Sequence, residues 1–444
     1  MFEKFSEKLL SVSEKLMKIK VLTAIRNSFA TLLPLIIGGS VASLLNNVLC
    51  STSDNAFSLA KVNGFEWLSQ YSEIFSKVNY ACISFMTIGV VLLIAKNLAK
   101  EYGKEEWVTS LVALASYITV CDLTASTTVE GMKEAVTISN VLPQSFTSSS
   151  NLFLGMIIAI IATAIFLKLS YLKQLKIKMP GGVPGNISHS FEVMIPGFIT
   201  IISVSAFAFF VKVLTGSTLS TLISTCIQAP LTGILTGLPG YLIIFFLVSV
   251  LWSFGLHGQQ ILKPIFYPVL FAAITANMEA INSEKVAEFI LNEPFMLCFT
   301  VVSGAGVTLG LIIAILLVSK RKDNKSVAKL SLLPGIFGIN ECMTFGMPIV
   351  LNPILIIPFI LVPMLTSCFA YFMTSIGFCG MMIYSIPPTL PIGLNVYMAS
   401  GGSLGALVTQ LLCLVISVIV YIPFVFILNR SSASKKAESG EAYE

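Results

Sequence analysis

Long apolar blocks recur along most of the chain and are separated by short polar or charged stretches. A helix of about 20 apolar residues is long enough to cross the hydrocarbon core of a bilayer. In the first half of the chain the blocks are residues 29–49, 79–98, 107–121, 152–172 and 193–214. In the second half they are residues 238–256, 295–318, 347–368 and 404–428. The pattern predicts an all-α protein that crosses a membrane many times.

The region 257–293 decides how many crossings there are. Its apolar portion is only about 14 residues and contains Pro264 and Pro268, so length alone is compatible with a re-entrant dip. Lys and Arg residues favour the cytoplasmic side of the membrane. The basic loop 320–329 falls on that side only if 257–293 adds one net crossing. We therefore expect about ten transmembrane helices, with re-entrant segments and with both termini in the cytoplasm.

Amphipathic stretches mark the boundaries of the expected domains. Charged and apolar residues alternate at helical spacing over residues 1–20, which predicts a helix lying on the inner leaflet. A second amphipathic stretch, 217–237, is expected to be an interfacial connector between two halves of the protein. The expected halves are a first one with five spans and a second one with re-entrant segments, followed by a disordered tail: residues 21–216, 238–430 and 431–444.

Composition excludes a soluble protein of this size. Of the 444 residues, 55% are hydrophobic and only 11% are charged, whereas soluble domains carry about 25% charged residues. The net charge of +5 lies in short loops and at the amino end, which indicates membrane orientation rather than binding to nucleic acid. Nine scattered cysteines without a CxxC motif, and only two histidines, predict small buried thiols, no metal site and no cofactor.

Two segments interrupt the apolar pattern with polar residues. The first follows an apolar block and contains His257, Gly258, Gln259 and Gln260. The second contains Asn340 and Glu341 within glycine- and proline-rich sequence. Irregular backbone at membrane depth survives only inside protein or beside a watery cavity, and an intramembrane carboxylate is a functional candidate by default.

The residue types in these segments suit a sugar. A hydroxyl group both donates and accepts hydrogen bonds, so amides, an imidazole and a carboxylate can satisfy it. Simpler interpretations remain: Glu341 could pair with a basic neighbour or reach the interface, and His257 could be a packed imidazole. His189 lies in a basic loop and is expected to be solvated or interfacial.

Several motifs together resemble those of a known family. They are AIR at 24–26, MIPG at 194–197, GLHG at 255–258, GINE at 338–341 and FGMPIVLNP at 345–353. In these motifs the chain resembles the membrane IIC component of the lactose, cellobiose and diacetylchitobiose phosphotransferase system, over about residues 1–430. The resemblance implies a homodimer in a bacterial cell membrane. It also implies that the amino-terminal half makes the dimer contact and that the carboxy-terminal half holds one disaccharide.

The resemblance further implies a mechanism. His257 and Glu341 would contact the sugar near the 6-hydroxyl, which a separate cytoplasmic IIB protein phosphorylates from a phosphocysteine. Glu341 would accept the hydroxyl proton while His257 and Gln260 orient the acceptor, or the two roles would be reversed. The chain would thus complete a phosphotransferase only together with IIB. The set expected to bind the substrate is His257, Gly258, Gln259, Gln260, Asn340 and Glu341.

Two departures from the family pattern leave the identity of the disaccharide open. Cys342 stands where the family usually has proline, and the segment 384–394 lacks the tryptophan commonly found there. Two other functions also stay open. One is a secondary sugar transporter coupled to protons or sodium, with Glu341 as the titrating group; the other is a sugar receptor that moves nothing.

Overall fold

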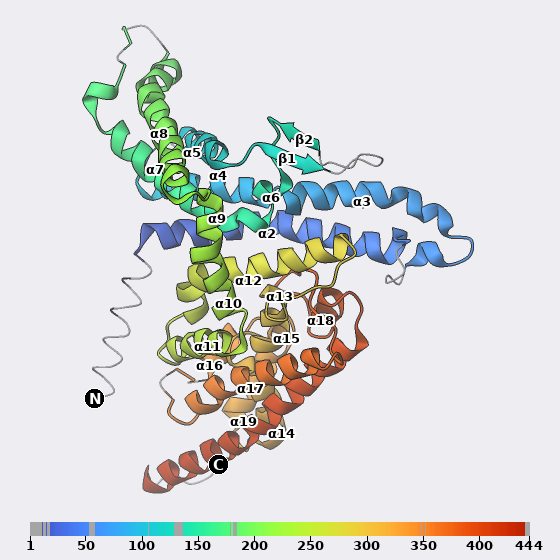
Figure 1. Ribbon diagram of the computed structural model, residues 1–444. Helices are drawn as coiled ribbons and strands as arrows, with labels where there is room; N and C mark the ends of the chain where they lie inside the picture. The colour runs from blue at the N-terminus through green and yellow to red at the C-terminus, as the bar shows by residue number, and fades with distance from the viewer. Residues whose placement is uncertain are drawn as a thin grey trace. The chain divides into compact units, whose positions relative to one another are not determined.

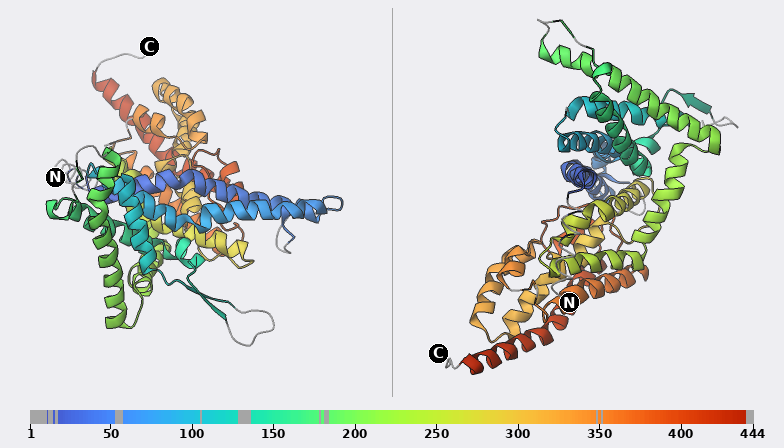
Figure 2. Two further views of the ribbon diagram at one scale, coloured as in Figure 1. Left: turned by 90° about the horizontal axis from the view of Figure 1, so that it is seen from above. Right: turned by 90° about the vertical axis from the view of Figure 1, so that its left-hand side faces the viewer.

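The computed structural model describes residues 11, 15, 18–52, 58–104, 106–127, 136–177, 179–180, 184–347, 349–350 and 352–439. Within these residues the chain is helical except for one antiparallel hairpin, in which β1 (Thr124–Thr127) pairs with β2 (Val136–Ser139). The hairpin extends away from its neighbouring helices (Figure 2). The chain forms two compact units, which we call unit 1 and unit 2.

Unit 2 comprises Leu16–Ala42 and Trp67–Leu231. Its helices α4, α5 and α7 pack against one another, and α8 packs against α5 and α7. Small residues allow these helices to approach closely, because a Cβ on Gly155 of α7 would lie 2.7 Å from Thr87 Cγ2 of α4. The elements that lie in or enter this unit are α2 (Lys20–Leu45), η3 (Glu66–Tyr71), α3 (Ser72–Asn79), η4 (Tyr80–Ser84), α4 (Met86–Glu101), α5 (Glu106–Val120), α6 (Gln144–Thr147), η5 (Ser149–Asn151), α7 (Leu152–Ser170), η6 (Lys173–Leu175), α8 (Gly185–Thr215), α9 (Leu219–Ile223) and η7 (Ser224–Gln228).

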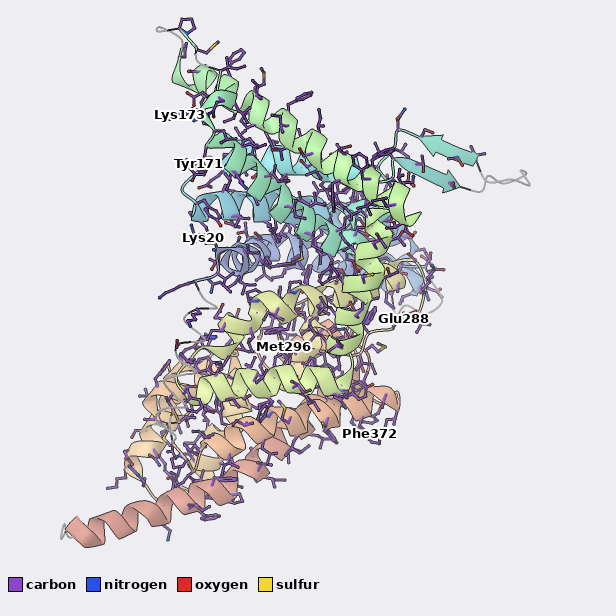
Figure 3. The ribbon with its side chains drawn as sticks, turned by 60° about the vertical axis from the view of Figure 1, so that its left-hand side comes forward. Lys20, Tyr171, Lys173, Glu288, Met296 and Phe372 are labelled. Carbon is purple, nitrogen blue, oxygen red and sulfur yellow. The ribbon has the colours of Figure 1, made fainter. Side chains whose placement is uncertain are left out.

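Basic and aromatic side chains gather at one end of the unit 2 helices. Lys20 Nζ lies 3.9 Å from the ring centroid of Tyr102, and Lys104 Nζ lies 4.1 Å from that of Tyr171. These contacts join the start of α2 to the end of α4, and the loop after α4 to the end of α7. Figure 3 shows Lys20, Tyr171 and Lys173 at this end. The predicted basic loops of the first half therefore share one side of the unit.

Unit 1 comprises Met1–Lys15, Ser43–Glu66 and Thr232–Glu444. Helices α14, α17 and α19 lie side by side in it, and α11 packs against α12 and α17 (Figure 1). The elements that lie in or enter this unit are η1 (Asn46–Cys50), η2 (Leu59–Lys61), α10 (Ala229–Leu235), α11 (Leu238–Ser253), α12 (Gly258–Asn282), α13 (Glu293–Phe295), η8 (Met296–Thr300), η9 (Ala305–Val307), α14 (Thr308–Val318), α15 (Lys322–Ile336), α16 (Glu341–Gly346), α17 (Ile356–Ser375), α18 (Leu394–Ala399) and α19 (Leu404–Ser439).

The helices account for a protein that crosses a membrane many times. Over the described residues, 8 helices are long and apolar enough to span a bilayer. A further pair, Leu219–Leu235 and Leu238–Ser253, passes the same test together but is bent by 74°, and Glu106–Val120 is a shorter apolar helix. The prediction of an all-α polytopic membrane protein is confirmed. The first part of the bent pair lies in the predicted connector 217–237, and the second part lies in the apolar block predicted at 238–256.

The structure resolves the ambiguous region 257–293 into a helix. α12 covers 25 residues and includes Pro264 and Pro268, so the charge-based expectation of a further crossing agrees with the structure better than the length-based re-entrant dip. The apolar portion is short because polar residues such as Gln260 and Asn277 occupy both ends of the helix. The block expected at 347–368 forms a helix only from Ile356, which α17 continues to Ser375.

The predictions for the two ends of the chain can be compared with the structure to different extents. Most of the predicted interfacial helix at 1–20 lies outside the described residues. At the other end, α19 extends to Ser439 and so includes residues that the sequence predicts as a disordered tail. A helix that is already nucleated by a long span can propagate through Ala, Lys and Glu at low cost. Residues 440–444 lie outside the described part.

Candidate functional site

The two polar segments lie next to each other in unit 1, and Trp252 lies between them. Its ring centroid is 4.4 Å from that of His257 and 6.4 Å from that of Phe345. A Cβ on Gly255 would lie 3.1 Å from Val350 Cγ1, so the backbones also come close. Trp252 thus joins the segment that contains His257 to Phe345, which lies one turn after Glu341; that His257 and Glu341 act on one substrate stays a prediction.

His257 begins α12 as its N-cap. Its Nδ1 accepts a hydrogen bond from the backbone N–H of Gln260 at 3.3 Å, which satisfies one of the free N–H groups of the first helical turn. Because Nδ1 accepts, the neutral imidazole carries its proton on Nε2 and can donate from there. The capping bond therefore fixes the ring as a hydrogen-bond donor.

Gly258 and Asn340 both make contacts within the protein. Gly258 is buried, and a Cβ there would lie 2.2 Å from the carbonyl oxygen of Val248. The Asn340 side chain is 4% exposed, and its Nδ2 donates to the carbonyl of Ala305 at 2.9 Å. Both residues stand in the predicted substrate-binding set, and each supports the backbone beside a residue with a freer side chain: Gln259 in one segment and Glu341 in the other.

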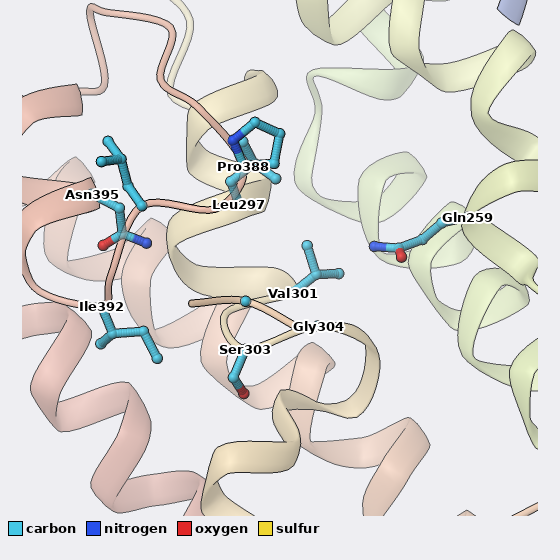
Figure 4. A pocket seen from close by; sticks show the side chains of 10 residues that line it. Gln259, Leu297, Val301, Ser303, Gly304, Pro388, Ile392 and Asn395 are labelled. Atoms are coloured by element: carbon cyan, nitrogen blue, oxygen red, sulfur yellow. The ribbon is translucent and has the colours of Figure 1, made fainter. Parts of the chain in front are cut away.

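A cavity of about 150 Å³ lies beside these segments. Gln259 reaches it from α12, opposite Asn395 and Pro388 (Figure 4). Of the predicted residues only Gln259 lines it; His257 and Glu341 do not. The lining residues are Gln259, Leu297, Val301, Ser303, Gly304, Gly338, Pro388, Leu390, Ile392 and Asn395. Because ligand pockets typically measure roughly 300–1,000 Å³, a disaccharide would extend beyond this cavity.

One wall of the cavity is a helix broken at membrane depth. The span Glu293–Val318 is interrupted where Ser303, Gly304, Gly306 and Val307 all have positive φ. Val307 has φ 50° and ψ 51°, a left-handed conformation that is strained for a β-branched residue. Sequence reasoning missed this break, although the run Ser-Gly-Ala-Gly at 303–306 was a signal for it.

Sequence reasoning also missed Glu293, whose side chain is 1% exposed. Ser385 Oγ donates to its Oε2 at 3.1 Å. Glu293 lies one turn before Leu297, which lines the cavity. The signal in the sequence was a carboxylate in Asn292-Glu293-Pro294, immediately before an apolar block. Glu341 is thus not the only carboxylate near the site.

The remaining candidates from the sequence are a metal site, the cysteines and His189. Within the described ranges, no cluster of three or more His, Cys, Asp or Glu side chains could hold a metal ion. All nine cysteines are free, and most are buried or half-buried, but Cys226 and Cys342 are exposed, unlike the buried thiols that the sequence predicts. His189 is exposed.

Interrupted helices that surround a polar-lined cavity define a class of protein, the membrane transporters that bind a solute within their spans. A sequence model of the family "Phosphotransferase system, EIIC" matches residues 26–363. The chain belongs to this family and is a permease component of a sugar phosphotransferase system. Membership agrees with the expected phosphotransferase permease and disfavours the secondary-transporter alternative.

Relatives and a solved structure resemble the chain over nearly its whole length. The oligo-beta-mannoside-specific EIIC component of Bacillus subtilis is 32% identical over 99% of this chain and 96% of the relative. The cellobiose-specific EIIC component of Geobacillus stearothermophilus is 30% identical, covering 97% and 94%. The crystal structure of ChbC, the IIC component of the N,N'-diacetylchitobiose-specific system, has a TM-score of 0.88 and 29% identity, covering 98% of both chains.

Proposed function

We propose that this permease binds a disaccharide in unit 1 and carries it inward for phosphorylation at the 6-hydroxyl by a separate IIB protein. Support comes from relatives named for oligo-beta-mannoside, cellobiose and lactose, and from the fold of ChbC. The observation that carries the proposal is the contact of Trp252 with His257 on one side and with Phe345, beside Glu341, on the other.

The geometry supports a division of the disaccharide between two parts of the site. One ring fits the cavity, where the amides of Gln259 and Asn395 and the hydroxyl of Ser303 can meet sugar hydroxyls. The second ring extends toward His257, two residues before Gln259, and toward Glu341, three residues after the lining residue Gly338. Glu341 is exposed, so its carboxylate is accessible to a ligand.

The chemical step needs a base next to the acceptor hydroxyl. The 6-oxygen attacks the phosphorus of the IIB phosphocysteine, the S–P bond breaks, and the cysteine leaves as a thiolate. The hydroxyl proton passes to the Glu341 carboxylate, while His257 Nε2 donates to the acceptor oxygen and orients it. The product gains about 1.5–2 negative charges, and the nearby Glu293 and Glu341 side chains offer no positive charge to hold it, so release follows.

Orientation and assembly belong to the same proposal. The cluster of Lys20, Lys104 and Lys173 with aromatic side chains at one end of unit 2 suits the cytoplasmic surface. The basic loop at 320–329 and the basic residues near both ends of the chain favour the same side for the termini, where IIB acts. Exposed apolar residues on α8, among them Phe198, Phe207 and Phe210, suit either lipid or the homodimer contact that we propose for the amino-terminal half.

The proposal is tested by reconstituting phosphoryl transfer with purified permease, IIB and its phosphate donors. Direct binding to a panel of cellobiose, diacetylchitobiose and lactose first identifies the sugar. Glu341→Gln should then lower transfer by at least about 100-fold while the dissociation constant of the sugar changes little. Glu192→Gln, an equivalent change in unit 2, is the matched control and should leave both unchanged.

Two results would contradict the proposal. Full transfer by Glu341→Gln would remove this residue as the base, and loss of transfer in His257→Gln would then support the reversed assignment. Sugar uptake into vesicles that needs no phosphoryl donor and collapses with an uncoupler would instead favour coupling to an ion gradient.

A further inference from the structure

The last long helix, α19, carries buried polar side chains that the proposed sugar site does not explain. Gln410, Ser417 and Tyr421 are each 0% exposed. Their spacing of i, i+7 and i+11 puts them on one face of the helix. None of them lines the cavity. Polar side chains within a membrane span are costly unless they serve packing or function, so each needs a partner.

Gln410 forms hydrogen bonds with two separate segments that line the cavity. Its Nε2 donates to the carbonyl of Cys298 at 2.9 Å and to Asn395 Oδ1 at 2.9 Å. Its Oε1 accepts from the backbone N–H of Gly393 at 2.7 Å. Cys298 follows Leu297, which lines the cavity, and Asn395 lines it directly. One buried amide thus joins the helix before the break to the loop that faces it.

Tyr421 forms a hydrogen bond with the backbone inside the break. Its hydroxyl donates to the carbonyl of Gly306 at 2.6 Å, inside the left-handed stretch that ends at Val307. A broken helix loses its own hydrogen bonds, and each buried carbonyl needs another donor. Asn340 donates to the adjacent carbonyl of Ala305, and Thr308 Oγ1 donates to that of Ser303. Ser303 and Gly304 precede the carbonyls of Ala305 and Gly306 in the chain, and both residues line the cavity.

α19 also presses directly against the far side of the broken helix. A Cβ on Gly310 of α14 would lie 2.0 Å from Ser417 Oγ, so the two helices are in close contact between the levels of Gln410 and Tyr421. The strained backbone at Val307 persists only if its surroundings hold it. The face of α19 supplies these surroundings through Gln410, Ser417 and Tyr421.

We infer that Gln410 and Tyr421 are positioning residues that set the shape of the sugar cavity from behind, without touching the sugar. Gln410 fixes the distance between Leu297 and Asn395, and Tyr421 fixes the break that presents Ser303 and Gly304. The inference rests on the proposed function only in assuming that the cavity takes a sugar ring. The affinity for sugar should therefore depend on a helix outside the site.

The test uses two isosteric pairs in the full-length protein. Tyr421→Phe removes one hydroxyl; its control is Tyr117→Phe in unit 2, where a buried tyrosine also donates to a carbonyl, that of Phe146, at 2.6 Å. Gln410→Met removes the amide; its control is Thr409→Val, the neighbouring residue on α19, which removes a hydroxyl that donates to the carbonyl of Gly405 in the same helix. The thermal stability of all four variants is measured alongside.

The first measurement is binding to the sugar of the cellobiose, diacetylchitobiose and lactose panel that the wild-type protein binds. Gln410→Met should raise the dissociation constant at least about tenfold and Tyr421→Phe about threefold to tenfold, by loss of preorganisation. In the transfer assay KM should rise while kcat at saturating sugar changes less than twofold. Equal losses in the controls, or unchanged affinity in both variants, would overturn the inference.

The second measurement needs no sugar, so it remains decisive if the proposed function fails and no panel sugar binds. Backbone hydrogen exchange should speed up at Gly393 and its neighbours in Gln410→Met, and over residues 305–309 in Tyr421→Phe. The controls should keep wild-type exchange there. Unchanged exchange in both regions would show that these bonds do not hold the cavity walls, and would end the inference.

Discussion

Unit 2 and unit 1 use their long-range polar bonds in different places. In unit 2, hydroxyls such as those of Ser116 and Thr200 bond to carbonyls four residues earlier in the same helix, and the amide of Asn79 bonds to the carbonyl of Gly39, 40 residues away. In unit 1, the amides of Asn340 and Gln410 reach carbonyls 35 and 112 residues away, in the broken span that lines the cavity.

The contrast follows from the continuity of the spans. An unbroken helix satisfies its own backbone, so its side chains are free to pack, as glycine and threonine do between α7 and α4. A broken span exposes carbonyls and N–H groups that other parts of the chain must satisfy. Unit 1 therefore combines the irregular backbone needed for a binding site with long-range polar bonds that hold it in place.

The largest effect is expected from Gly258→Ala. The added Cβ would lie 2.2 Å from the carbonyl oxygen of Val248 and 2.9 Å from its carbonyl carbon, so α11 and α12 would have to separate. We expect a loss of about 3 kcal/mol or more, seen as a large fall in melting temperature in detergent. Gly233→Ala is the control, because nothing lies within 4 Å of its Cβ; equal stability of the two variants would contradict this packing.

A long-range amide should matter more than a local hydroxyl. Asn277 Nδ2 donates to the carbonyls of Phe289 and Met382, and its Oδ1 accepts from the N–H groups of Glu288 and Phe289. Asn277→Leu should cost about 2–3 kcal/mol, since it leaves several buried groups unpaired.

Thr200→Val in unit 2 is the matched measurement. Its hydroxyl bonds only to the Pro196 carbonyl of its own helix, so the expected cost is below about 0.5 kcal/mol. Thermal unfolding of both variants compares the long-range amide with the local hydroxyl directly. Equal costs would remove the distinction between these two kinds of bond.

Charge at Glu293 should matter less than its hydrogen bond. Glu293→Gln keeps an acceptor for Ser385 Oγ and similar volume but removes the charge that faces Lys263. We expect a cost of about 1 kcal/mol for Glu293→Gln and about 2 kcal/mol for Glu293→Ala, by thermal unfolding. Should Glu293→Gln be the more damaging of the two, charge compensation rather than the hydrogen bond would be the main role of this residue.

The smallest effects are expected at exposed ion pairs, in both units alike. Lys176 and Glu192 lie 3.3 Å apart in unit 2, and Arg321 pairs with Asp323 in the loop before α15 and its first turn in unit 1. Both pairs are partly exposed, so each should contribute between about 0 and 1 kcal/mol. Glu192→Gln and Asp323→Asn should therefore shift the melting temperature only slightly.

The pH dependence of the Arg321 pair has a definite sign. The hydrogen bond from Arg321 lowers the pKa of Asp323 below its ordinary value of 3.8. The pair therefore stabilises the fold above pH 3.8, and this contribution is lost as the pH falls through the lowered pKa. Wild-type and Asp323→Asn proteins should differ slightly at neutral pH and converge in acid; a difference that grows in acid would contradict the pairing.

Sequence patterns predicted the fold class, the approximate spans and the two polar segments of the site. Span length and loop charge are local properties, which is why the crossing at 257–293 could be inferred from the basic loop at 320–329. The patterns did not show which residues also serve packing. Asn340 and Gly258 stay predictions as sugar-binding residues; in the structure the Asn340 side chain bonds to the carbonyl of Ala305, and Gly258 packs against the carbonyl of Val248.

Features missed from the sequence have a common physical cause. Glu293 and Gln410 look like isolated polar residues at or within apolar runs, and nothing nearby along the chain identifies their partners. Ser385 follows Glu293 by 92 residues, and Cys298 precedes Gln410 by 112. A break such as that at Ser303–Val307 is equally hidden, because part of its cost is offset by Asn340 and Tyr421, which are distant in the sequence, and only part by the neighbouring Thr308.

The order of apolar blocks and basic loops was enough to establish a membrane protein of many helices, because insertion into a bilayer depends on each segment's own length and charge. The shape of the cavity was not encoded in any one segment. It arises when α12, the broken span, the loop at 386–395 and α19 come together. Hydrogen bonds between such distant residues form only in the folded chain, since closing those long loops is unfavourable until packing compensates for the lost entropy.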